Sequence, residues 1–394
     1  MEVSQIYEVV NDITKEAIGE SAVLEEDLSN VVDYGHAVFD NMTMDNFCKK
    51  LIDRIGKVVF DTRKYTGFML PLYRESWEYG SVKELIYTTA LPEATENESW
   101  KLTPGASYDP NIFTGSPVAA KFYDHKTTIE VPLSLADIQV RSAFASRDQL
   151  NSFMSMLQTN VSNSLEVKQD ALAQRTVNSL IAHTLYNEFP SVTGDNYGNS
   201  TGVKAINLLK LYNAQFGQSL TFAQAMFSAE FMRYASLIIK NNIAYVKSMS
   251  TLFNCGALPT FTPADNLHLL MLSDFKNGVE TYLESDTFHN EFVAMPKSAS
   301  VPYFQGTGTS YSIDSLTKIH VDIIDPADDT TKKEIEASHI LGVMFDHNAA
   351  GISNENKRTT SNYNGKAEFT NYWYKVDCNY WNNLNSNCVV FFAA

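Results

Sequence analysis

Between Ser146 and Phe189 the sequence contains neither glycine nor proline, the two residues that most often interrupt a helix. Ser146 can cap a helix N-terminus, and Gln149 three residues later completes a capping-box pattern. Apolar residues recur at helical spacing: Leu150, Phe153, Met154, Leu157, Val161, Leu165, Leu172 and Leu180. We therefore predict one spine helix from Ser146 to Tyr186, about 60 Å long at 1.5 Å per residue. No compact domain can enclose such a helix, so part of its surface must meet water or another subunit.

A second element of unusual length lies near the end of the chain. From Ala367 to Trp381 alternate residues are predicted to share one face of a strand: Thr370, Tyr372, Tyr374, Val376, Cys378 and Tyr380. At about 3.3 Å per residue this strand would span roughly 50 Å. Because both elements are too long for an ordinary domain, we expect helix and strand to lie side by side. Cys388–Phe392 is a short apolar run that predicts one further buried strand.

The region from Ser191 to Asp346 mixes helical and strand patterns. The predicted helices are Ala205–Phe216, Thr221–Lys240 and Val279–Glu284, and the predicted strands are Leu267–Leu272, Lys318–Ile324 and His339–Phe345. Helices packed on a central sheet indicate an α+β fold. Before the spine helix we expect an N-terminal arm with a helix near Ile6–Ala17, an acidic loop at Glu25–Asp33, a helix at Asp45–Gly56 and a strand beginning at Val58.

Two predicted strands, Val82–Thr89 and Thr127–Leu133, flank a polar segment from Leu91 to Lys121 that carries four prolines. We interpret them as one extended hairpin with a long loop. A long loop without structure of its own is typical of a segment that binds something. Three large aromatic residues lie in it, and we predict that they make contacts between subunits: Trp100, Tyr108 and Phe113.

Composition excludes several functional classes. The net charge of −16 argues against a surface whose main task is to grip nucleic acid, and 44% hydrophobic residues suffice for a core. No apolar run approaches the length of a membrane span, and the N-terminus lacks the pattern of a signal peptide. The cysteines form no CxxC pair, which favours free thiols in a reducing compartment over a zinc site or disulfides: Cys48, Cys255, Cys378 and Cys388.

The sequence has no Walker loop, GxSxG, HExxH or GxGxxG motif, so we predict no catalytic, cofactor-binding or metal-binding residue. His339 and His347 are read as packed or surface residues rather than metal ligands. The acidic run from Asp325 to Asp329 is read as a solvated turn rather than a cation site. Cys378 and Cys388 are read as small buried hydrophobes. Two small groups of cations are too few to form a nucleic-acid-binding patch and are read as ordinary surface charges: Lys49, Lys50 and Arg54, and Lys357 and Arg358.

The order of these elements resembles the major capsid protein fold of tailed bacteriophages, often called the Hong Kong ninety-seven fold. Three stretches look closest to small podoviruses of the phi-twenty-nine type: FCKKLIDRIGKVVF, YGSVKELIYTT, and GVMFDHNAAGISNENKRTTSNYNGKAEFTNYWYKV with the later NCVVFF. The resemblance implies residues 1–60 as an N-terminal arm and first helix, 61–135 as an extended loop hairpin, 136–190 as the spine helix of a peripheral domain, 191–346 as an axial domain, 347–383 as the return strand of the peripheral domain, and 384–394 as a final axial-domain strand.

The resemblance further implies a coat protein that assembles with itself, as pentamers and hexamers, into an icosahedral or elongated shell around double-stranded DNA. It implies a separate scaffold protein and a portal, weak contact with packaged DNA, no membrane, and assembly in the cytoplasm of a bacterial host. In a free subunit we expect Lys101, Lys121 and Lys126 to be open to trypsin. The alternative is an encapsulin-like compartment of the same fold that holds a cargo enzyme. Pores and a groove for a cargo peptide would favour the compartment, and packaged DNA would favour the virion.

Overall fold

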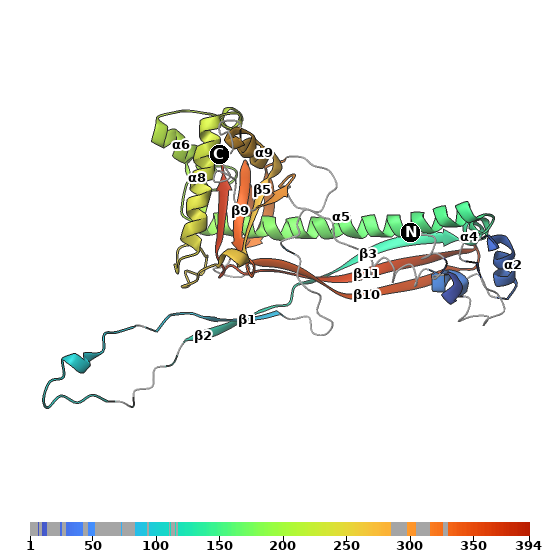
Figure 1. The fold of residues 1–394 in the computed structure, drawn as a ribbon, viewed down its shortest axis with the longest axis horizontal. Helices are drawn as coiled ribbons and strands as arrows, with labels where there is room; N and C mark the ends of the chain where they lie inside the picture. The colour runs from blue at the N-terminus through green and yellow to red at the C-terminus, as the bar shows by residue number, and fades with distance from the viewer. Residues whose placement is uncertain are drawn as a thin grey trace. The chain divides into compact units, whose positions relative to one another are not determined.

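The computed structural model in Figure 1 describes residues 7, 10–13, 24–25, 29–41, 46–51, 72, 83–92, 94–109, 111, 115, 117–284, 298–304, 316–325 and 330–394. The chain divides into two compact units, each assembled from three stretches. Unit one comprises Met1–Tyr79, Lys126–Ala173 and Ile352–Asn379, and unit two comprises Gly80–His125, Gln174–Gly351 and Tyr380–Ala394.

The predicted spine helix is present as α5, Arg147–Glu188. Ser146 caps it, because its Oγ accepts a hydrogen bond from the backbone N–H of Gln149 at 3.3 Å. In unit one α5 buries a single stripe of apolar side chains: Leu150, Met154, Leu157, Val161 and Leu165. From Leu172 to Leu185, by contrast, most positions around the helix are buried. The exposed outer face that we expected is therefore found on the part of α5 in unit one.

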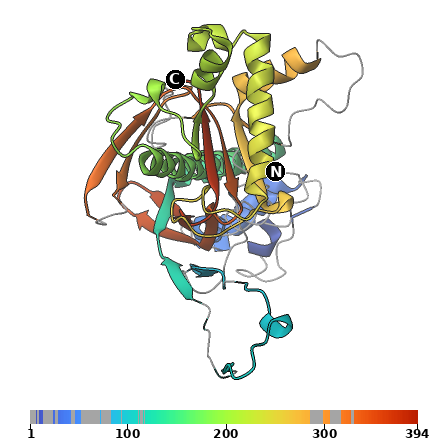
Figure 2. The same cartoon turned by 90° about the vertical axis from the view of Figure 1, so that its left-hand side faces the viewer.

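Unit one contains a three-stranded sheet in the order β10–β11–β3, made by Ala350–Asn364, Phe369–Asn382 and Lys126–Ala136. The predicted long strand is confirmed as β11. Its predicted face is buried at Thr370, Tyr372, Tyr374, Val376 and Cys378, whereas Tyr380 is only partly buried. Within unit one, α5 runs alongside this sheet in both views (Figures 1 and 2). Strand β10, whose sequence is mostly polar, was not predicted.

The N-terminal part of unit one is more helical than expected. Helix α2 spans Val31–Asn41 and begins inside the stretch read as an acidic loop, so that part of the prediction was wrong. Residues 10–13 and 46–51 are helical, within the two predicted helices, whose ends fall outside the described residues together with the strand expected at Val58. Phe47 meets Phe144 edge to face at 5.6 Å, just after the short helix α4, Asp137–Ala143.

Unit two is built on a five-stranded sheet in the order β4–β12–β9–β5–β6. Its strands are Ala205–Asn207, Cys388–Phe392, Ile340–Asp346, Leu267–Leu272 and Ala299–Val301. Strands β12, β9 and β5 match the predicted apolar runs, and all five residues of β12 are buried. The strand expected at Lys318–Ile324 is β7, Ile319–Ile324, but it pairs with β8, Lys332–Ala337, in a separate two-stranded sheet rather than in the central one.

The helices of unit two differ from the predictions at their starts. The segment expected as one helix from Ala205 begins with β4, and α6 spans Leu208–Phe216 after Asn207 caps it. The helix expected from Thr221 is two helices, α7 at Phe222–Ala225 and α8 at Ala229–Val246, because Ser228 caps a new N-terminus. Helix α9 spans Ser273–Glu284, and 3-10 turns occur at Glu98–Trp100, Tyr197–Asn199 and Ala264–Asn266.

The extended hairpin exists, but its second strand was assigned wrongly. Strand β1, Lys83–Thr88, pairs antiparallel with β2, Val118–Tyr123, and not with the strand that begins near Thr127. That later strand is β3, and it pairs with β11 in unit one. All six residues of β1 already pair with β2, which follows the loop directly. Strand β3 is therefore free to pair with β11 in the larger sheet.

Candidate interaction surfaces

One face of the β1–β2 hairpin is apolar and open to solvent. In the antiparallel register Glu84 pairs with Phe122, Ile86 with Ala120 and Thr88 with Val118. Residues directly opposite one another project to the same face, so Ile86, Val118 and Phe122 share it, and all three are exposed. A two-stranded sheet also has two unpaired edges. The hairpin therefore presents both apolar side chains and backbone groups that a neighbouring molecule could cover.

The loop beyond these strands carries the predicted contact residues. Trp100 is 95% exposed and Tyr108 is 48% exposed, while Phe113 lies outside the described residues. The tip has some local order, because Pro104 and Gly105, with φ +87° at the glycine, fit a type II turn closed by a hydrogen bond from Ala106 N–H to Thr103 O. The Tyr108 hydroxyl accepts a hydrogen bond from Thr103 N–H at 3.2 Å. The side chain of Trp100 therefore remains more exposed to solvent than that of Tyr108.

Sequence reasoning missed the apolar face of the hairpin itself. Val118, Ala120 and Phe122 alternate with other residues over six positions, which is the signal of a half-buried strand. They were read as the end of a polar loop because prolines precede them. Their alternation was the signal that could have placed both β2 and the three exposed apolar side chains.

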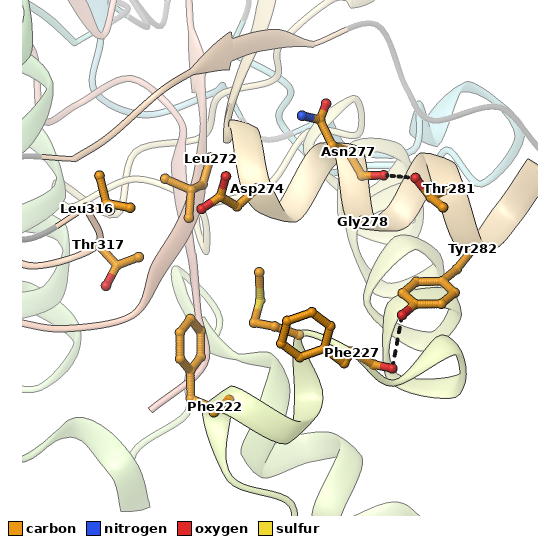
Figure 3. Close-up of a pocket in the computed structure, with 12 residues that line it drawn as sticks. Phe222, Phe227, Leu272, Asp274, Asn277, Gly278, Thr281, Tyr282, Leu316 and Thr317 are labelled. Atoms are coloured by element: carbon orange, nitrogen blue, oxygen red, sulfur yellow. Dashed lines mark hydrogen bonds between the residues drawn. The ribbon is translucent and has the colours of Figure 1, made fainter.

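A second candidate surface is an apolar pocket in unit two, with a volume of about 720 Å³. Figure 3 shows Phe222 and Phe227 on one side of it and Asp274 with Leu272 on the other, with Leu316 and Thr317 closing a third side. The side chain of Phe227 is 80% exposed at its rim. Tyr282 braces that rim, because its hydroxyl donates a hydrogen bond to the backbone oxygen of Phe227 at 3.2 Å. A pocket of this size could take one or two large apolar side chains.

The two histidines that the sequence singled out, His339 and His347, each contact another ring. His339 stacks on Phe222 with ring centroids 4.0 Å apart, and burial lowers the pKa of its imidazole, while nearby Asp195 acts the other way. His347 instead pairs with His268, with Nδ1 and Nε2 3.0 Å apart. No group of three or more metal-ligating side chains occurs within the described part of the chain.

The other residues considered in the sequence analysis are the acidic run at Asp325, two cysteines and five cations. Asp325 accepts a hydrogen bond from the Tyr186 hydroxyl at 2.7 Å, and residues 326–329 lie outside the described residues. Cys378 and Cys388 are buried, as predicted. Arg358 forms an ion pair with Asp377 at 2.6 Å, Lys49 and Lys357 are exposed, Lys50 is partly buried, and Arg54 lies outside the described residues. None of the helices that the structure describes is both long and apolar enough to cross a membrane.

The chain is similar to known proteins in sequence and in fold. A family model described as Phi29-like phage major capsid protein matches residues 10–392. The chain is 23% identical over 197 residues to the major capsid protein of Bacillus phage GA-1, a match covering 48% of this chain and 39% of that protein. It is similar to a chain in the capsid structure of Staphylococcus phage Andhra, with 12% identity, 82% and 83% of the two chains covered, and a TM-score of 0.48. A chain from the capsid of Cyanophage P-SCSP1u gives 12% identity, 84% and 89% coverage, and a TM-score of 0.43.

Proposed function

Since this chain belongs to the family of Phi29-like phage major capsid proteins, we propose that many copies of it assemble into the closed shell that encloses a phage's double-stranded DNA. The observation that supports this most directly is the β1–β2 hairpin with its loop. Its apolar face and Trp100 are exposed, although burial of such side chains is favourable. The family match favours this role over the encapsulin-like compartment that the sequence left as an alternative.

The hairpin is suited to act between subunits because two strands contribute little stability by themselves. A single two-stranded hairpin is marginal in water, and this one has no third strand among the described residues. Among the described residues of its loop, Leu91 and Leu102 are also apolar and exposed. We propose that a neighbouring subunit covers Ile86, Phe122 and Trp100, so that assembly completes what the isolated chain leaves open.

The two compact units of the chain also correspond to proposed domains of a shell subunit. We propose that the region holding the spine helix α5 and the sheet β10–β11–β3 serves as a peripheral domain, and the region of the five-stranded sheet as an axial domain. Copies meet as pentamers and hexamers. The same chain adopts slightly different shapes at fivefold and sixfold positions, which lets the shell close. A separate scaffold protein, a portal and weakly contacted packaged DNA complete the assembly in the host cytoplasm, and the chain works as a structural protein without catalysis.

The test is limited proteolysis with trypsin of free subunits and of assembled particles, followed by mass spectrometry. Lys101 lies in the exposed loop, with a side chain 79% exposed, so we expect cleavage after it in the free chain and protection in the particle. Lys121 on β2 should behave likewise.

Lys126 supplies the internal control. It was expected to be open, but it lies in β3, paired with Asn379 of β11, with a side chain 33% exposed. We now expect it to resist cleavage in both states. Equal cleavage after Lys101 in subunits and particles would show that the hairpin is not covered on assembly.

A further inference from the structure

Unit two exposes a group of apolar residues at the C-terminal end of α8, far in sequence from the hairpin. Four large side chains are exposed there: Tyr245, Met249, Leu252 and Phe261. They are held together by the backbone, because Thr262 N–H donates to Val246 O at 3.0 Å and Ser250 and Thr260 exchange two hydrogen bonds of 3.0 and 3.1 Å. We call these four residues, with the exposed Lys247 among them, the α8-end patch.

Single exposed apolar residues are ordinary, but a contiguous group marks an interaction site. The α8-end patch gathers its four side chains within two short segments, 245–252 and 261, that the hydrogen bonds bring together. Lys247 is the charged residue of that stretch, and it has no ion-pair partner within the part of the chain that the structure describes. The patch is therefore apolar with one cation.

The pocket of Figure 3 has the opposite character. It is hollow, its lining is mainly apolar, and its one charged lining residue is Asp274 at the start of α9. Asp274 is exposed and, like Lys247, lacks an ion-pair partner among the described residues. One surface of unit two thus offers large side chains beside a cation, and another offers a hollow of about 720 Å³ beside an anion.

We propose that the α8-end patch of one copy docks into this pocket of the next copy, with Lys247 beside Asp274. The inference rests on the proposed function, because it needs copies of the chain to meet. The two surfaces are different, so the contact is head to tail, and such contacts close into rings when the rotation between copies allows. The complementary charges set partner and orientation in a chain whose net charge is −16.

The first test is charge reversal in the full-length chain, read by sedimentation velocity and electron microscopy of particles. Lys247→Glu and Asp274→Lys each place like charges together, and each should raise the concentration needed for assembly at least about tenfold. The double variant restores an opposite pair and should return to within about threefold of the wild type. Lys332→Glu, an equal charge change on the exposed start of β8, should leave assembly unchanged.

The second test needs no loss of assembly. Tyr245→Cys and Phe227→Cys alter exposed side chains, so both variants should fold, which circular dichroism melting checks. A short bismaleimide should cross-link a mixture of the two variants into dimers, and either variant alone should give far less. Ala223→Trp, which fills the pocket, should block this cross-link.

The outcomes separate the two levels of the proposal. Single reversals that assemble like the wild type, or a double variant that does not recover, would overturn this contact while the shell stands. Mixed cysteine variants that assemble without cross-linking would do the same. A wild-type chain that stays monomeric under all conditions would remove the shell and this contact together.

Discussion

Arg358 in β10 donates a hydrogen bond from Nη1 to Oδ2 of Asp377 in β11 across 2.6 Å. The other carboxylate oxygen of Asp377 accepts a hydrogen bond from the hydroxyl of Thr128 in β3, also at 2.6 Å. One carboxylate, 5% exposed, thus ties together all three strands of the sheet in unit one. The hydrogen bond from Arg358, and then that from Thr128, hold the pKa of Asp377 below its ordinary value, although burial opposes them.

The first prediction concerns this carboxylate and pH. Because the pKa of Asp377 is lower in the folded chain than in the unfolded one, its contribution is complete above the unfolded pKa and is lost as pH falls through the folded pKa. Asp377→Asn should lower the free energy of unfolding by about 1–3 kcal/mol at neutral pH. The difference from wild type should shrink as pH falls below the ordinary pKa of an aspartate, as measured by chemical denaturation at several pH values.

Glu130→Gln is the matched control for that experiment. Glu130 pairs with Lys375 at 3.0 Å on the same sheet, but its side chain is 44% exposed. Exposed pairs contribute little, so the loss should stay below about 1 kcal/mol. A deficit of Asp377→Asn that stays constant across the pH range would mean that lost packing, not charge, causes it.

The second prediction concerns the spine helix. Leu165 is fully buried in α5, so Leu165→Ala should cost about 2–5 kcal/mol of stability. Val167, two residues on, is 42% exposed, and Val167→Ala should change stability by less than about 0.5 kcal/mol. We expect Leu165 to lie against Tyr374, and a double-mutant cycle with Tyr374→Leu should then give a coupling of about 0.5–3 kcal/mol. Additive losses would place the two side chains apart.

The third prediction separates folding from assembly at the hairpin. Since Trp100 is almost fully exposed, Trp100→Ala should leave the melting temperature of the free chain unchanged. If a neighbour covers Trp100, the substitution should weaken assembly by about 2 kcal/mol per contact, which is about thirtyfold in affinity. Glu96→Gln in the same loop removes an exposed ion pair of 3.9 Å and should have little effect. Assembly of Trp100→Ala at the wild-type concentration would count against the hairpin contact.

The fourth prediction concerns the cysteines. Cys48, Cys378 and Cys388 are buried, and Cys255 is partly so. Burial raises the pKa of the Cys388 thiol to about 12 and that of Cys255 to about 11, so few thiolates exist at neutral pH. Subunits should therefore run as monomers on nonreducing gels, with and without reductant. A ladder of multimers that collapses on reduction would contradict this.

Elements with a strong local pattern were predictable from the sequence. Helix α5 follows from a long run without helix breakers, and the apolar run Cys388–Phe392 coincides with the observed β12. Helix α2 was missed because Gly35 and the β-branched Val31 and Val32 are weak helix formers. Packing overrides that preference: a β-carbon on Gly35 would lie 2.9 Å from that of Phe144, so the glycine permits a close approach.

Elements that depend on distant partners were not predictable. Strand β10 has a polar sequence, and its neighbour β11 supplies the reason for it to be extended. The partner of β3 could not be read locally either, since Thr128 and Asp377 are 249 residues apart. The interaction surfaces divide in the same way. Trp100 and Tyr108 stood out as aromatics in a polar loop, whereas the pocket is gathered from α7, α9 and the 316–317 segment and leaves no motif.

The position of β12 has a consequence for synthesis. This strand lies between β4 and β9, and it is the last strand of its sheet to be translated. Until Phe392 has left the ribosome, β4 and β9 have no partner between them and the sheet is in two pieces. A chain stopped before Cys388 would keep two apolar strand edges open and would be a substrate for chaperones and proteases rather than a building block. Competence to assemble is thus withheld from incomplete translation products.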